Sequence, residues 1–181
     1  MKKEGVRFKL MLEYFLNKIG LKDLKKLSVL DVACGRCNEA EVLIELFGKV
    51  RGIDNNPKKI KRIKGKNLNA RFGVIDASNL SNISDHKFNF VLVRHPNIFG
   101  DKWKKIYEEC FRVTKEKGIL ISTFYHEEEY LLGKKLIKNA SYDIKFAKEN
   151  KFYLKSFGFD KYVIIAKKVY KRGWLKKLFG I

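Results

Sequence analysis

Apolar residues recur along this chain at two spacings, one typical of helices and one typical of buried strands. Near the N-terminus the recurring residues are Phe8, Met11, Leu12, Phe15, Leu16 and Ile19, followed by Gly20. Their spacing predicts an amphipathic helix that the glycine ends. Short apolar runs then occur at 28–33, 50–53, 71–75, 88–93 and 119–124. We expect these five runs to be strands.

Three segments between these runs have apolar residues on one helical face. The three sets are Ala40, Leu43, Ile44 and Phe47; Ile60 and Ile63 after Pro57; and Trp103, Ile106, Tyr107, Cys110 and Phe111. Gly48, Gly65 and Gly118 come after the three segments, and we expect them to end the helices. Strands that alternate with helices indicate βαβ units. The pattern therefore predicts an α/β fold with a mostly parallel sheet and helices on both faces.

The pattern is less regular beyond residue 125. It predicts a helix over 127–139 and a strand over 162–166, while 142–154 fits either a strand or a helix. The chain has 181 residues and no repeat or linker rich in proline or glycine. We expect one domain. Its parts are an N-terminal helical region (1–25), a core (26–125), the rest of the sheet (126–169) and a tail (170–181).

Composition narrows the possible classes of protein. Hydrophobic residues make up 45% of the chain, enough for a core, and the net charge is +20. Such a charge favours a polyanionic partner, although a lysine-rich composition is also typical of heat-adapted proteins. Three cysteines, an odd number, argue against a disulfide framework. Without an apolar run long enough to span a bilayer or a signal-peptide pattern, we expect a cytoplasmic protein.

Two basic stretches contain no acidic residue. They lie between residues 54 and 76 and after residue 160. In the tail, the basic residues alternate with Tyr170, Trp174, Leu175, Leu178, Phe179 and Ile181. This tail could bind RNA, lie on an anionic membrane, or dock on its own domain or on a second copy.

Acidic residues lie within or directly after three of the predicted strands. Asp31 lies inside the first apolar run, and Asp54 and Asp76 come directly after the second and third. Ligands of open parallel sheets bind at the carboxyl ends of the strands. There, Asp54 could accept hydrogen bonds from both hydroxyls of a ribose, and Asp76 could accept one from an adenine amino group. The alternative is that these residues form turns and helix N-caps.

These motifs, in this order, resemble the Rossmann-like S-adenosylmethionine-dependent methyltransferases. Residues 29–35 resemble the family's acidic residue and glycine-rich turn, and 50–54 and 74–77 resemble its second and third motifs. Residues 88–93 resemble its fourth strand, and 111–121 resemble the passage from the next helix to the fifth strand. The resemblance implies a doubly wound sheet of seven strands with a reversed last strand. It also implies that S-adenosylmethionine binds over the first three strand ends.

The resemblance further implies a role for each residue of the site. Asp31 would orient the cofactor amino group, and the loop at the methionine moiety would contain Ala33, Cys34 and Gly35. Asp54 would hold the ribose and Asp76 the adenine, with Asn55 and Ala77 beside these two anchors. Arg94 would pair with the cofactor carboxylate. Two positions depart from the family, which usually has glycine at both. Ala33 adds only a methyl group, whereas Cys37 stands where the turn often needs a positive φ.

The methyl acceptor is not identified by the sequence, and RNA and a small molecule both remain possible. Enzymes that methylate exocyclic amines carry a proline-containing motif at the place of residues 94–97. This segment has the proline of that motif but lacks its aromatic residue. His95 is a candidate general base, or else a loop histidine that contacts backbone or solvent. Methyl transfer needs mainly alignment and the exclusion of water.

Two other classes of function remain as alternatives. Ala33 and Cys37 suggest a catalytically inactive RNA-binding or scaffold subunit, which could act with a protein partner or as a homodimer. Cys34 and Cys37 also form a C-x-x-C between a strand and a helix start, as in thiol oxidoreductases, where the helix and Arg36 would lower a thiol pKa. A zinc site would need two more ligands, and Cys110 lies on an apolar stripe, so we expect no metal.

Overall fold

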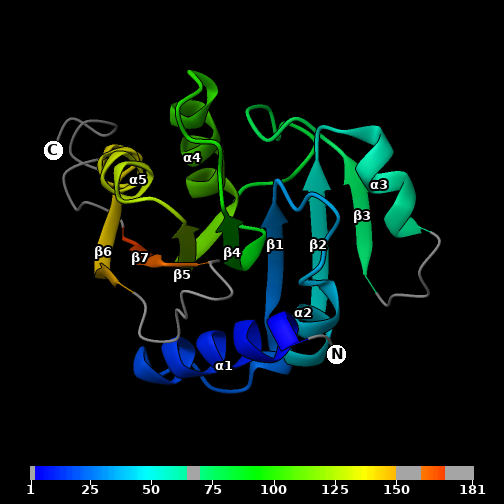
Figure 1. The fold of residues 1–181 in the computed structure, drawn as a ribbon, viewed down its shortest axis with the longest axis horizontal. Coiled ribbons are helices and arrows are strands. Elements are labelled where there is room, and N and C mark those ends of the chain that lie inside the picture. The colour runs from blue at the N-terminus through cyan, green and yellow to red at the C-terminus, as the bar shows by residue number, and fades with distance from the viewer. Residues whose placement is uncertain (1–2, 65–69, 150–159, 170–181) are drawn as a thin grey trace, which may run out of the picture.

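The computed structural model describes residues 3–64, 70–149 and 160–169, and its seven strands form a single sheet (Figure 1). The strands are β1 (Ser28–Val32), β2 (Lys49–Asp54), β3 (Arg71–Val74), β4 (Phe88–Arg94), β5 (Thr114–Phe124), β6 (Tyr142–Glu149) and β7 (Tyr162–Lys168). Their order across the sheet is β3-β2-β1-β4-β5-β7-β6. Strands β1 to β5 pair in parallel, and β7 pairs antiparallel with both β5 and β6. The seven-stranded sheet with a reversed last strand is confirmed. Of the segment 142–154, which fitted either a strand or a helix, residues 142–149 form strand β6 and 150–154 lie outside the described residues.

Helices cover both faces of this sheet. They are α1 (Lys3–Lys18), the 3-10 helix η1 (Leu24–Lys26), α2 (Ala40–Leu46), α3 (Pro57–Lys64), α4 (Lys102–Val113) and α5 (Glu127–Asn139). Alternate residues of each strand point to opposite faces. Val29 and Phe90 accordingly pack in one core with α1 and α2, while Leu30 and Val91 pack in another with α4 and α5. No helix in the described part of the chain has the length and apolarity needed to cross a bilayer.

Two of the predicted helix ends are wrong, and Gly65 lies outside the described residues. α2 ends with an extended Phe47, and a Cβ on Gly48 would lie 1.9 Å from the Lys25 carbonyl oxygen, so this glycine permits a close approach of backbone. α4 ends at Val113, and Gly118 lies within β5. A Cβ on Gly118 would lie 2.7 Å from the Thr114 side chain, in the part of β5 where its register with β4 shifts.

The order of the strands places the candidate residues. The sheet runs from β1 to β2 and β3 on one side and from β1 to β4 and β5 on the other. In open α/β sheets, ligands bind beyond the carboxyl ends of the strands at such a reversal of order. The loop after β1 and the last residue of β2 both lie at that edge. The predicted tail, 170–181, lies outside the described residues.

Candidate functional site

The loop that joins β1 to α2 is built on three left-handed residues. The φ angles are 55° at Ala33, 59° at Gly35 and 46° at Cys37. The Cys34 N–H donates to the Ile53 carbonyl at 2.9 Å, and the Cys37 N–H donates to the Cys34 carbonyl at 2.7 Å. These bonds hold the loop in a tight turn against the end of β2.

Two of these left-handed positions carry a side chain, which costs conformational energy. An L-residue other than glycine loses roughly 1–2 kcal/mol in this conformation. The expectation of a positive φ at Cys37 is confirmed. Ala33 also has a left-handed backbone, which was not anticipated from the sequence, so this departure from glycine adds backbone strain as well as a methyl group.

Asp54, the last residue of β2, fastens this loop. Its Oδ2 accepts the backbone N–H of Gly35 at 2.9 Å, and its Oδ1 accepts that of Asn56 at 2.9 Å. The Lys59 ammonium of α3 lies 3.7 Å from Oδ2. The carboxylate is only 4% exposed. Each carboxylate oxygen can accept two hydrogen bonds, and one backbone N–H takes up one acceptor position on each.

Asp31 is buried within β1 beneath the loop. It is 1% exposed, and its Oδ2 lies 3.6 Å from the Cys37 sulfur, which donates to it. Burial raises the pKa of the Asp31 carboxyl well above its usual range, and the nearby charge of Glu39 raises it further. A cation placed against this carboxylate would offset both effects.

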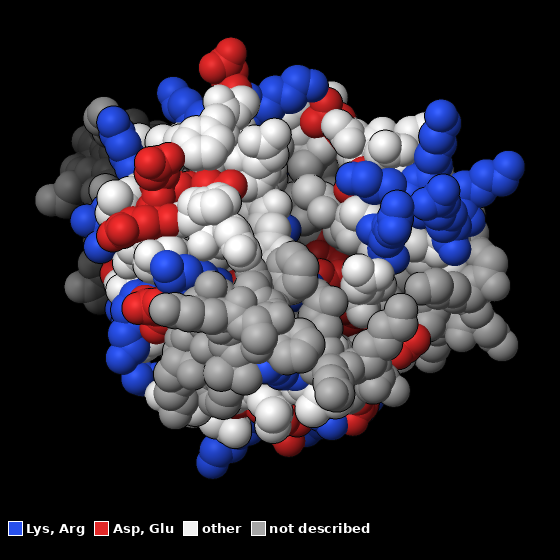
Figure 2. All heavy atoms as spheres, viewed as in Figure 1, with Lys and Arg blue, Asp and Glu red and all other residues white. Residues whose placement is uncertain are grey.

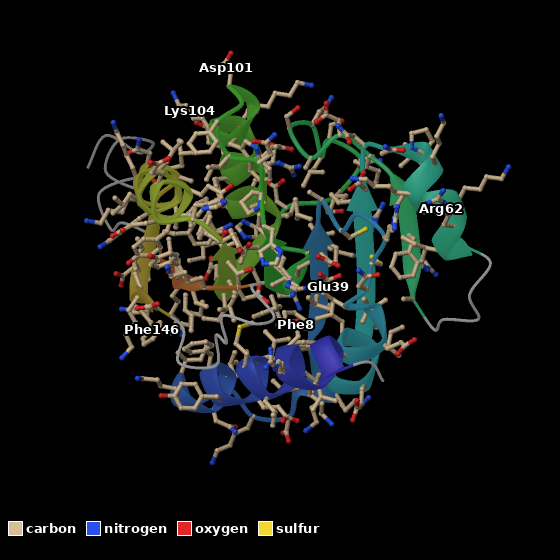
Figure 3. All side chains as sticks on the ribbon, in the orientation of Figure 1. Phe8, Glu39, Arg62, Asp101, Lys104 and Phe146 are labelled. Atoms are coloured by element: carbon tan, nitrogen blue, oxygen red, sulfur yellow. The ribbon has the colours of Figure 1, made fainter. Side chains whose placement is uncertain are left out.

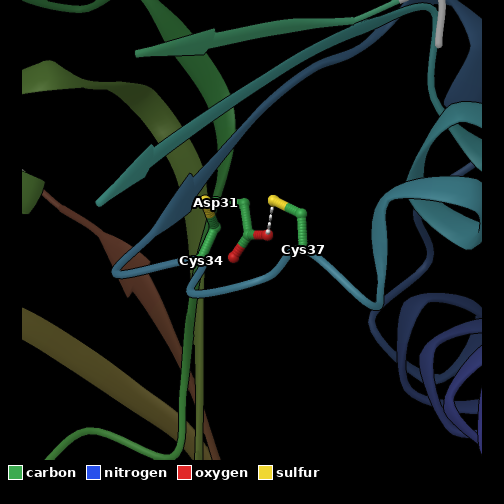
Figure 4. Close-up of side chains that lie close together, drawn as sticks. All are labelled: Asp31, Cys34 and Cys37. Carbon is green, nitrogen blue, oxygen red and sulfur yellow. Dashed lines mark hydrogen bonds between the residues drawn. The ribbon is translucent and has the colours of Figure 1, made fainter. Parts of the chain in front are cut away.

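Cys34 and Cys37 are both buried beside Asp31 (Figure 4). A hydrogen bond with Cys34 and burial raise the pKa of the Cys37 thiol. A reactive thiol of an oxidoreductase needs a lowered pKa. The prediction that the helix start and Arg36 would lower a thiol pKa is therefore wrong at Cys37.

Asp76 and its neighbours lie farther along the same edge. Asp76 accepts the Ser78 N–H and hydroxyl on one oxygen and pairs with Lys102 on the other, 2.9 Å away. These partners, the Ser78 N–H first, lower the pKa of Asp76 to about 2. The bonds to Ser78 form the turn that was the alternative interpretation of this residue. Ala77 is buried in the core, and Asn55 is exposed beside Asp54.

Arg94 ends β4 at the predicted place but has protein carboxylates as partners. Its Nε lies 2.9 and 3.0 Å from the two carboxylate oxygens of Asp160, and its Nη2 lies 2.7 Å from Oδ2. Its Nη1 donates to Glu39, ahead of α2. The guanidinium also lies 4.7 Å from the ring centre of Phe8 on α1. Figure 3 labels Phe8 on α1 and Glu39 just ahead of α2. Arg94 thus pairs with two carboxylates of the protein, and its expected pairing with a cofactor carboxylate stays a prediction.

His95 comes directly after Arg94, has a φ of 49° and is held to the backbone. Its Nε2 accepts the Asp160 N–H at 2.9 Å and lies 3.0 Å from that residue's Oδ1. The backbone N–H of His95 donates to the Thr123 carbonyl at 3.0 Å. This geometry fits the interpretation of His95 as a loop histidine that contacts backbone, which was the alternative to a general base.

Glu39, Asp160 and Phe8 were missed by the sequence reasoning. Asp160 is buried, precedes β7 and is 66 positions from Arg94, so no local pattern connects the two. Burial alone would raise the pKa of Asp160, but Arg94 and His95 hold it well below its usual range. Glu39 offered a weak signal, since acidic residues are common at helix starts.

The central part of this chain is similar to known methyltransferases. The family model described as "Methyltransferase domain" matches residues 29–118. An uncharacterized methyltransferase of Bacillus subtilis, YbaJ, is 27% identical over 128 residues, 67% of this chain and 49% of the relative. This chain thus matches about half the length of that relative.

Two solved structures share the fold. The PH0226 protein of Pyrococcus horikoshii superposes with a TM-score of 0.72 at 19% identity, over 93% of this chain and 92% of the other. A SAM-dependent methyltransferase of Aquifex aeolicus superposes with a TM-score of 0.70 at 20% identity, over 89% and 93%. The matched domain, the strand order and the acidic residues at the strand ends lead to one conclusion: this chain belongs to the Rossmann-like S-adenosylmethionine-dependent methyltransferase family.

Proposed function

We propose that this chain binds S-adenosylmethionine over β1 and β2 and transfers its methyl group to an acceptor. The observation that carries the proposal is Asp54, whose two oxygens each hold one loop N–H and keep one acceptor position. A carboxylate in this arrangement suits the two hydroxyls of a ribose. A turn former alone has no need of such a buried anion.

The other residues of the site fit the same cofactor. Asp31 is a buried carboxylate with a thiol as a weak partner, and the ammonium of the methionine moiety would supply the missing positive charge. Among the described residues nothing lies within 4 Å of where a Cβ of Gly35 would stand, so the space over this glycine is open. Ala33 and Cys34 complete the loop. We propose that Asn55, Asp76 and Ala77 line the adenine side.

Within this proposal the protein supplies position more than chemistry. S-adenosylmethionine, when bound, supplies a methyl group on a positively charged sulfur that is already activated for transfer. Asp54 and Asp31 would fix the two ends of the cofactor, and the loop would shield it from water. Arg94 holds Glu39 and Asp160 together, and so joins α2, β4 and the start of β7 around the site. His95 is assigned as a positioning residue through Asp160.

The test of this assignment is a calorimetric titration with S-adenosylhomocysteine on matched variants. Asp54→Asn keeps the shape of the side chain but removes its charge, and it should weaken binding by about 10- to 100-fold, the worth of hydrogen bonds to a charged group. Asp143→Asn on the far strand β6 is the matched control and should bind like wild type. Equal affinities of the two variants would show that Asp54 does not hold the ligand.

An anionic acceptor, such as RNA, is supported by the face of α3 that adjoins this site. Lys58, Lys61 and Arg62 are exposed on α3, while Ile60 and Ile63 are buried beneath them. Figure 2 shows basic side chains gathered over this helix, and Figure 3 places Arg62 on its outer side. A cluster of this kind binds phosphates with an affinity that falls as salt rises.

Charge reversal on α3 tests this acceptor class. The double variant Lys58→Glu/Lys61→Glu should bind RNA more weakly and with a smaller salt dependence than wild type. Lys135→Glu/Lys138→Glu on α5 changes the net charge equally and should keep the salt slope. The same loss of RNA binding in both variants would mean that net charge alone, and not the α3 face, attracts the nucleic acid.

A further inference from the structure

Three side chains that can bind metals converge beneath the loop after β1. They are Asp31, Cys34 and Cys37, all buried, and their oxygen and sulfur atoms lie within 4.8 Å of one another (Figure 4). The Asp31 oxygen and the Cys37 sulfur are 3.6 Å apart. In a tetrahedral zinc site, bonds of about 2.3 Å to sulfur and about 2.0 Å to oxygen place such a pair about 3.5 Å apart. The Asp31 oxygen and the Cys37 sulfur are therefore already separated by about the distance that two ligands of one zinc ion would have.

The fold brings the two thiols to the carboxylate in two ways. The left-handed φ of Cys37 and its hydrogen bond to the Cys34 carbonyl close a turn that carries both sulfurs inward. On the neighbouring strand, a Cβ at Gly52 would stand 3.0 Å from the Cys37 sulfur. The absence of a side chain at Gly52 thus leaves the room that this sulfur occupies.

We propose that Asp31, Cys34 and Cys37 form a binding site for a single thiophilic divalent cation such as Zn²⁺ or Cd²⁺. Two sulfurs and one carboxylate oxygen favour borderline and soft metals over Mg²⁺ or Ca²⁺, which prefer oxygen ligands. Three protein ligands leave a fourth position for water. On binding, two metal–sulfur bonds replace two S–H bonds, two protons pass to solvent, and no electron is transferred.

The site would also regulate the proposed activity. Asp31 is the residue that we assign to the cofactor ammonium, so a metal on its carboxylate would compete with S-adenosylmethionine. This competition rests on the proposed function, whereas the metal site itself does not. The same loop would then exist in two states, one that holds the metal and one that accepts the cofactor.

The metal site is tested by titrating the reduced protein with Cd²⁺ in a thiol-free phosphine reductant. The thiolate-to-cadmium charge-transfer absorption should rise to saturation at one Cd²⁺ per chain. Cys37→Gly should abolish this saturable band. It removes both the sulfur and the strained backbone, and because these two effects on stability oppose each other, the variant is expected to fold. Ala33→Gly makes the same kind of change in the same loop but keeps both thiols, so it should retain the band.

Two outcomes would overturn the site. One is the absence of a saturable band in the wild-type protein, and the other is an equal band in Cys37→Gly and Ala33→Gly. The third cysteine, Cys110, lies on the buried face of α4, and Cys110→Ala should leave the signal unchanged. A band that disappears with Cys110→Ala would also contradict the assignment.

Competition is tested by repeating a titration with S-adenosylhomocysteine in the presence of one equivalent of Cd²⁺. The metal should weaken binding to the wild-type protein by about tenfold or more, and should have no effect on Cys37→Gly. An unchanged affinity in wild type, with the cadmium band present, would overturn the competition. A lack of S-adenosylhomocysteine binding by the metal-free protein would instead overturn the proposed function, because the cadmium band does not depend on it.

Discussion

The Oδ2 atom of Asp54 accepts a 2.9 Å hydrogen bond from the backbone N–H of Gly35. This bond joins the end of β2 to the loop after β1, and so fixes the relative positions of the two groups assigned to the cofactor. The left-handed conformation of Gly35 aims its N–H at the carboxylate. A ligand held by Asp54 would therefore pass directly over this glycine.

Gly35→Ala should reduce cofactor affinity strongly. The added methyl group would enter the open space over the loop, and the left-handed backbone would become strained by about 1–2 kcal/mol. Gly20→Ala is a matched control, since Gly20 also has a positive φ and open space around its Cβ position but lies after α1. Both variants should melt at lower temperature, and only Gly35→Ala should lose S-adenosylhomocysteine binding. Retained binding in Gly35→Ala would place the ligand elsewhere.

Ala33→Gly should stabilise the protein. Ala33 is exposed and left-handed, so the substitution removes strain without loss of buried contacts, and we expect a gain of roughly 0.5–1 kcal/mol in the free energy of unfolding. Ala77→Gly, the same change at a buried position, should destabilise the fold. Urea unfolding of the three proteins checks both signs. A loss of stability in Ala33→Gly would mean that Ala33 does not have a strained left-handed backbone in solution.

Arg94→Met should be strongly destabilising. The guanidinium is buried between Asp160 and Glu39, with 7% of its side chain exposed, and its removal leaves two carboxylates without this partner. Breaking a buried ion pair from one side typically costs about 3–5 kcal/mol. Arg62→Met on the exposed face of α3 should change stability by less than about 0.5 kcal/mol. Similar melting temperatures of the two variants would show that the buried pairs contribute little.

Stability should fall in acid, in part through Asp160. The folded-state pKa of Asp160 lies well below its usual range, so the stabilisation is complete above the unfolded-state pKa of about 4 and is lost as the pH falls below it. Asp160→Asn should therefore lose less stability than wild type between about pH 5 and pH 2. Urea midpoints measured across this range provide the comparison. Parallel curves for the two proteins would contradict the low pKa.

The sequence predicted the helices and strands whose apolar spacing is regular. It also predicted candidate site residues where an acidic residue lies in or just after an apolar strand. Asp31 and Asp54 were found in this way, because a carboxylate next to an apolar run is rare without a partner. Gly118 was misassigned because β5 begins with the polar residues 114–117, which carry no strand pattern. The partners of Arg94 could not be predicted, since Glu39 and Asp160 meet it only through the folded sheet.

The most direct test of the central proposal is a calorimetric titration of the reduced, metal-free wild-type chain with S-adenosylhomocysteine. The geometry of Asp31, Gly35 and Asp54 predicts saturable binding of one molecule per chain with a micromolar dissociation constant. The absence of binding heat, together with an unchanged melting temperature at millimolar ligand, would contradict the proposal that this loop holds the cofactor.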